Sequence, residues 1–131
     1  MATIVKFEDL EIWKEAVKMG VMIYRVTEEG KMSKDFSARD QLRRAAISVS
    51  NNIAEGFEYN NNRLFVRFLM YAKGSAGEVR SLLYVLKEAG MIEENVFKPL
   101  WNSAVKLSKS IEGFRKYLRT LDRTNPKSSN L

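Results

Sequence analysis

The chain has 131 residues, 45% of them hydrophobic and 29% charged, a composition that suits one soluble domain with a modest core. It contains no His and no Cys, so the ligands of most zinc and non-haem iron sites and the partners of Ser-His-Asp or Cys-His catalysis are missing. We therefore predict a protein that has no metal, cofactor or enzymatic activity. No apolar run is long enough to span a bilayer and no signal-peptide pattern is present, so we expect a cytoplasmic location without a membrane partner.

The first helical pattern begins near Asp9 and ends at Gly30, a residue type that often terminates helices. Its apolar residues form two stripes on nearly opposite faces. One stripe is Leu10, Trp13, Val17, Val21 and Tyr24, and the other is Ile12, Ala16, Met19, Ile23 and Val26. A small bundle cannot cover both faces of one helix. This favours a subunit interface over the alternative, a helix that is buried on all sides within the monomer.

The second helix is predicted to run from Phe36 or Ala38 to Glu55, and Gly56 is expected to follow it in the left-handed conformation. Candidate N-caps and one core stripe complete this pattern: Ser37 and Asp40 as caps, and Leu42, Ala46, Val49 and Ile53 as the stripe.

The third helix is predicted from Asn61 to Ala89, with an N-cap in the run "YNNN" and Gly90 as its stop. Its inward stripe is Leu64, Phe68, Ala72, Ser75, Val79, Leu82 and Leu86. The run "GSAG", residues 74–77, has no Gly-Lys-Ser/Thr sequence and fails the phosphate-loop pattern. We expect its small residues to let another backbone pack closely.

The fourth helix is predicted from Asn95 to Leu121, and Pro99 is tolerated near its first turn if Asn95 is the cap. Its apolar stripe is Val96, Leu100, Ala104, Leu107, Ile111, Phe114, Leu118 and Leu121. Four helices with short connections predict an all-α fold, an antiparallel up-down-up-down four-helix bundle over residues 1–122. Residues 123–131 are expected to form a disordered polar tail.

Polar residues occupy one narrow sector of the second helix, beside its core stripe: Gln41, Arg44, Ser48, Asn52 and Glu55. The carbonyls at a helix C-terminus repel a carboxylate, so Glu55 needs a compensating partner. We expect Glu55 to be half-buried and paired, either with free N–H groups at the start of the third helix or with an Arg. That Arg would be Arg63 or one from a neighbouring subunit. The predicted role of Glu55 is structural and not catalytic.

Four stretches carry a family resemblance: "FEDLEIWKEAVKMGVMIY", "QLRRAAISVSNNIAEGF", "RFLMYAKGSAGEVRSLL" and "LKEAGMI". They resemble a bacterial four-helix-bundle family that includes proteins encoded within intervening sequences of 23S ribosomal RNA genes. The resemblance covers about residues 7–121 and is most specific at residues 52–56 and at Gly74, Ser75 and Glu78. The chain departs from the family at Ser50, where Pro is common, and at residues 37–38, where Gly-Leu is common.

The resemblance implies a left-handed bundle. The family is similar to the accessory proteins of diversity-generating retroelements, which assemble as homopentamers and bind nucleic acid. This similarity implies a homo-oligomer, with a pentamer favoured, and an RNA or DNA partner. Together with the sector above, the resemblance defines one polar motif: Gln41, Arg44, Ser48, Asn52, Glu55, Gly56, Gly74, Ser75 and Glu78.

The net charge of +6 is unevenly distributed. Residues 1–96 carry fourteen basic and fourteen acidic side chains, whereas residues 97–131 carry eight basic ones against Glu112 and Asp122. A basic patch attracts nucleic acid, but cations also suit a helix C-terminus and keep a tail soluble.

We therefore predict a non-enzymatic oligomer that binds structured RNA or DNA electrostatically, with two candidate surfaces. One is Arg39, Arg43, Arg63 and Arg67, and the other is Lys109, Lys116, Arg119 and Arg123. Each cluster has a plain alternative, a solvated helix face. The alternative function is a protein-interaction scaffold that binds no nucleic acid.

Overall fold

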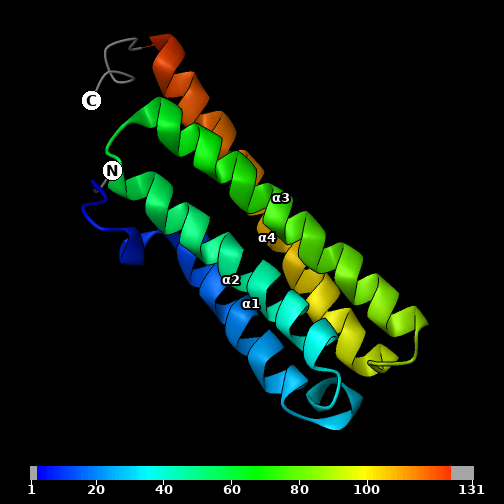
Figure 1. The fold of residues 1–131 in the computed structure, drawn as a ribbon. Coiled ribbons are helices and arrows are strands. Elements are labelled where there is room, and N and C mark those ends of the chain that lie inside the picture. The colour runs from blue at the N-terminus through cyan, green and yellow to red at the C-terminus, as the bar shows by residue number, and fades with distance from the viewer. Residues whose placement is uncertain (1–2, 125–131) are drawn as a thin grey trace.

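The computed structural model describes residues 3–124, which form four α-helices and two short 3-10 helices (Figure 1). The α-helices are α1 (Glu11–Thr27), α2 (Phe36–Glu58), α3 (Asn62–Glu88) and α4 (Glu94–Thr124). The 3-10 helices, η1 (Phe7–Asp9) and η2 (Gly30–Ser33), flank α1. No helix in this described part of the chain is long and apolar enough to cross a membrane.

Successive helices run antiparallel, and each packs against two neighbours (Figure 1). Helix α1 contacts α2 and α4, and α3 contacts the same two helices from the other side. The predicted all-α, up-down-up-down four-helix bundle is therefore confirmed, while its left-handedness stays a prediction. Helix α4 continues two residues beyond the predicted domain boundary at residue 122. Residues 125–131 of the predicted tail lie outside the described residues.

The core follows the predicted stripes closely on three helices. The α2 stripe and four of the five residues of the second α1 stripe are buried, and most of the α4 stripe is buried as well. On α3 the buried stripe is rotated relative to the prediction, and consists of Phe65, Leu69, Ala72, Ala76, Val79, Leu83 and Leu86. The predicted residues Leu64, Phe68, Ser75 and Leu82 are only half-buried. The rotation arises because α3 must bury its surface against both α2 and α4.

Three of the predicted helix-end residues are correct and the others are wrong. Gly30 and Gly90 have φ values of +62° and +76°, which a residue without a Cβ adopts readily. Asn61 caps α3 by accepting a hydrogen bond of 3.0 Å from the Leu64 N–H. Helix α2, however, is capped by neither predicted residue.

The N-cap of α2 is Asp35, whose carboxylate accepts from the Ala38 N–H at 3.1 Å. This helix therefore begins before Ser37 and Asp40, the predicted caps. Helix α4 likewise begins one residue before Asn95, at Glu94. The N–H groups of Val96 and Phe97 donate to the Glu93 carbonyl. Asn95 is therefore not the cap, and Pro99 lies inside the helix.

Gly56 does not terminate α2, which corrects a further expectation about the helix ends. The helix runs through Gly56 to Glu58, and Asn60 takes the positive φ of 50° instead. Gly56 is buried against α3, where an added Cβ would lie 2.6 Å from the Cβ of Phe68. This residue is glycine because two helix backbones approach each other closely here.

Candidate functional surfaces

Three residues of the predicted polar motif form a hydrogen-bond network between α2 and α3. The Oγ atoms of Ser48 and Ser75 lie 2.8 Å apart. Asn52 Nδ2 donates to the Ser48 carbonyl at 2.7 Å and to Ser48 Oγ at 3.0 Å. All three side chains are half-buried, so their polar groups need these partners. The network fixes the register of α2 against α3, a structural role.

Glu55 does not have the expected buried pairing. It is exposed, and its Oε1 accepts a hydrogen bond of 3.3 Å from the Tyr59 hydroxyl. The N–H group of Leu64 at the start of α3 is taken by Asn61, and Glu55 forms no ion pair with Arg63 among the described residues. Within the described chain, the expected half-buried position is wrong, because the Glu55 side chain is exposed to water, which screens the helix dipole. Pairing of Glu55 with an Arg of a neighbouring subunit stays a prediction.

The remaining motif residues divide between a groove and open surface. A groove of about 540 Å³ between α2 and α3 is lined by Ser37, Asp40, Gln41, Arg44, Ala45, Ser48 and Glu78. Gly74 lies on the exposed side of α3, where an added Cβ would meet nothing within 4 Å. The close backbone packing predicted for "GSAG" is therefore wrong at Gly74 within this chain. The groove lining carries two acidic side chains, Asp40 and Glu78, against Arg44, so it has no excess of positive charge.

The structure does not bring the first candidate nucleic-acid cluster together. Helices α2 and α3 are antiparallel (Figure 1), and the Ser48–Ser75 contact gives their register, so Arg43 is level with about residue 80 of α3. At 1.5 Å per residue, Arg63 is then roughly 25 Å further along the bundle. Arg63 and Arg67 are exposed at one end of α3, and Arg39 and Arg43 are near the other end.

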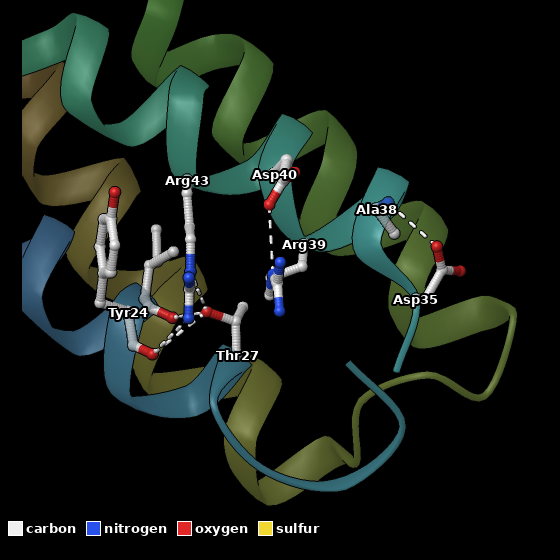
Figure 2. Close-up of polar contacts among 8 residues, drawn as sticks. Tyr24, Thr27, Asp35, Ala38, Arg39, Asp40 and Arg43 are labelled. Atoms are coloured by element: carbon white, nitrogen blue, oxygen red, sulfur yellow. Dashed lines mark hydrogen bonds and ion pairs between the residues drawn. The ribbon is translucent and has the colours of Figure 1, made fainter. Parts of the chain in front are cut away.

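Arg43 connects α2 to the C-terminus of α1 (Figure 2). Its Nε donates to Thr27 Oγ1 at 2.8 Å and its Nη2 to the Tyr24 carbonyl at 3.3 Å. The guanidinium also lies 4.4 Å from the centroid of the Tyr24 ring. Arg39 forms an ion pair of 3.2 Å with Asp40 and lies over the Phe36 ring. Arg43 therefore has the contacts of a structural residue, since a cation stabilises a helix C-terminus.

The second cluster is partly exposed and partly in a groove. A groove of about 410 Å³ between α3 and α4, here called the basic groove, is lined by Lys73, Arg80, Val105, Ser108, Lys109, Glu112, Gly113 and Lys116. Arg119 is exposed beyond it on α4, and the Arg123 side chain lies outside the described residues.

Lys73 and Arg80 face this groove from α3, and neither was among the cations predicted from the sequence. Their seven-residue spacing equals that of Lys109 and Lys116, and two helical turns place such residues on one face. The shared spacing could have indicated from the sequence that the two pairs of cations each lie on one helix face.

Glu112 is the one acidic residue of the basic groove, and it is already neutralised. Arg115 donates to both of its carboxylate oxygens at 2.9 Å, and Lys73 Nζ lies 3.1 Å from Oε1. The hydrogen bonds from Arg115, with further contributions from Lys73, lower the pKa of Glu112 to about 2 against the effect of desolvation. The carboxylate therefore stays ionised at neutral pH, and it balances Arg115 more than it does the lysines of the groove.

An apolar surface lies on the opposite pair of helices. A groove of about 390 Å³, here called the α1–α2 apolar groove, is lined by Ala16, Val17, Gly20, Val21, Tyr24, Arg25, Glu28, Ile47 and Ser50. Val21 is 41% exposed, and Tyr24 and Ile47 are each 38% exposed. The first apolar stripe of α1 is thus partly uncovered, which agrees with the expectation that this helix has two apolar faces.

Nothing in the described residues resembles a metal centre, since no group of three or more Asp, Glu, His or Cys side chains could hold an ion. The fold and its surfaces define a small four-helix-bundle protein with one basic groove and one exposed apolar groove. The chain belongs to the family described as 23S rRNA-intervening sequence protein, whose model matches residues 8–113.

The fold is also similar to a crystal structure from the S23 ribosomal protein family of Bacteroides thetaiotaomicron, a protein of unknown function. The two chains are 20% identical, and the TM-score is 0.73. The similarity covers 80% of this chain and 98% of the other. No curated protein matches the chain.

Proposed function

We propose that the protein is a non-enzymatic oligomer that binds nucleic acid electrostatically through the basic surface of α4. The observation that supports this best is the set of exposed cations Lys109, Lys116 and Arg119, which form no ion pair with any described residue. Unpaired cations are available to neutralise phosphates and to release their counterions. The family's description, which refers to 23S rRNA, favours RNA as the partner.

The proposed oligomer uses the α1–α2 apolar groove as a contact between copies of the chain. Exposed Val21, Tyr24 and Ile47 would lose unfavourable contact with water on association. The similarity to pentameric accessory proteins favours five subunits. Sedimentation equilibrium should then give about five times the chain mass of 15.1 kDa. Val21→Glu together with Ile47→Glu should give a monomer, while a parent that is already monomeric at micromolar concentration would contradict this part of the proposal.

Charge reversal tests the nucleic-acid part. Lys109→Glu, Lys116→Glu and Arg119→Glu, combined in one variant, should weaken binding to all RNA sequences alike without changing the fold or the mass. Arg63→Glu with Arg67→Glu reverses exposed cations at one end of α3 and serves as the comparison. If the comparison variant alone loses binding, the wrong surface has been chosen.

A protein-interaction scaffold is the second candidate, and the exposed apolar groove favours it. Such a scaffold would bind its partner through Val21, Tyr24 and Ile47, and the binding would survive high salt. RNA binding that falls steeply as salt rises distinguishes the first candidate from this one.

A further inference from the structure

The basic groove contains cationic side chains from two helices that have no counter-charge. Arg80, Lys109 and Lys116 line it and form no ion pair with any residue that the structure describes. Only Glu112 opposes them, and its carboxylate is held by Arg115 and Lys73. The lining therefore carries four cationic side chains against one carboxylate, and its electrostatic potential is positive.

Two buried polar atoms in the same groove have no hydrogen-bond partner among the described residues. They are Ser108 Oγ and Arg80 Nε. Ser108 is only 7% exposed, and a buried hydroxyl without a partner is costly. A helical Ser could bond to the carbonyl four residues earlier, yet no such bond is present here. An acceptor with negative charge that entered the groove would satisfy these donors and the unpaired cations together.

The arrangement of the cations indicates the shape of that acceptor. Lys109 and Lys116 are seven residues apart on α4, which places them about 10 Å apart along the helix, and Lys73 and Arg80 have the same spacing on α3. The two helices are antiparallel neighbours, so these pairs form two facing rows. Gly113 lies between Lys109 and Lys116 along α4, and an added Cβ there would meet nothing within 4 Å. Such a groove suits an elongated anion with several oxygens.

We infer that the basic groove binds phosphate oxyanions, with Arg80 and Ser108 donating hydrogen bonds and Lys109 and Lys116 supplying charge. Guanidinium matches the geometry of a phosphate group, and ammonium acts as a point charge beside it. This inference deepens the proposed function, because it names the part of the basic surface that contacts phosphate. The phosphate comes either from a nucleic-acid backbone or from a small free ion, and separate binding measurements distinguish these sources.

Inorganic pyrophosphate is the small probe, measured by isothermal titration calorimetry on the full chain at low salt. Lys109→Gln with Lys116→Gln should weaken its binding tenfold or more. The matched control, Lys98→Gln with Lys106→Gln, removes equal charge from exposed positions of α4 outside the groove and should change the affinity less than threefold. Equal weakening in the two variants, or no pyrophosphate binding by the parent, would overturn the inference.

Ser108→Ala provides a second test that does not depend on charge. The variant should bind pyrophosphate several-fold more weakly, yet melt at the same temperature as the ligand-free parent or higher, because it removes an unpaired buried hydroxyl. An unchanged affinity would show that this hydroxyl does not contact the anion. A loss of melting temperature would show that the hydroxyl serves the fold instead.

A fluorescent single-stranded RNA, titrated with the same variants, separates this inference from the proposed function. If the groove variant loses both ligands, the phosphate is that of the RNA backbone. If the parent binds pyrophosphate but no RNA, the groove is a small-anion site and the proposed function fails. If RNA binding is unchanged in the groove variant, the proposed function stands and the groove inference fails. An acidic peptide that binds more tightly than pyrophosphate would also overturn the inference.

Discussion

Replacing Gly56 with Ala tests whether the close approach of α2 to α3 requires a residue without a side chain at this position. The added Cβ would lie 2.6 Å from Phe68 Cβ, 3.1 Å from Phe65 Cδ1 and 3.4 Å from Phe68 Cγ. Carbon atoms that are not bonded prefer a separation of about 3.5–4.0 Å, so the first contact is too short by about 1 Å. The Phe68 Cβ is fixed to the backbone, and rotating its side chain cannot relieve this contact. Helix α2 or α3 must therefore shift.

Two opposing effects set the size of the change. Overpacking a well-filled interior costs about 1–3 kcal/mol, whereas Ala in place of Gly within a helix contributes up to about 1 kcal/mol of stability. We expect Gly56→Ala to lower the free energy of unfolding by about 1–2 kcal/mol. Gly74→Ala is the matched control, because it is the same substitution in a helix at an open position. The control should raise the free energy of unfolding by up to about 1 kcal/mol.

Urea unfolding followed by circular dichroism measures both variants under identical conditions. The two substitutions should shift the midpoint in opposite directions. A Gly56→Ala variant as stable as the parent would refute the close-approach explanation, and Gly56 would then have some other role.

Further predictions concern residues whose contacts the structure defines. Arg43→Ala should lower the free energy of unfolding by about 1–3 kcal/mol, since it removes charge-assisted hydrogen bonds to the end of α1. Arg39→Ala removes a surface ion pair and should lower the free energy of unfolding by less than about 1 kcal/mol. Thermal melts compare the two variants. Glu55→Ala should change the free energy of unfolding by less than about 0.5 kcal/mol because its side chain is exposed, and a loss of several kcal/mol would restore the paired interpretation. The pKa of Glu112 is lowered from 4.5 to about 2, so the ionised carboxylate should stabilise the fold above pH 4.5 by about 1 kcal/mol after solvent screening. This contribution should disappear as the pH falls toward 2. Glu112→Gln should flatten that part of the curve of stability against pH.

The fold could be predicted from sequence because its signals are local and repeated. Apolar spacing of three and four residues gave the four helices, and the glycines at positions 30 and 90 marked true turns. Gly56 was misinterpreted because glycine before a polar run looks the same whether it ends a helix or admits a neighbouring helix. Only the position of Phe68 on another helix decides between the two.

The candidate site could be predicted only in part for a similar reason. Lys109 and Lys116 were found because the last quarter of the chain has excess positive charge. Lys73 and Arg80 were missed because the first 96 residues are balanced in charge, which conceals cations that gather only when α3 packs against α4. The exposure of Glu55 was also beyond sequence reasoning, since a polar sector beside a core stripe can be covered or open.

The salt dependence of RNA binding tests the central claim most directly. A single-stranded RNA titrated into the parent protein at several salt concentrations gives the slope of log K against log salt, and each neutralised phosphate contributes about −0.7. If Arg80, Lys109, Lys116 and Arg119 each neutralise one phosphate, the slope should be about −3, and reversing the charge of Lys109 and Lys116 should reduce it by about half. A parent protein that binds no RNA even at the lowest salt, or that binds with a slope near zero, would contradict the account.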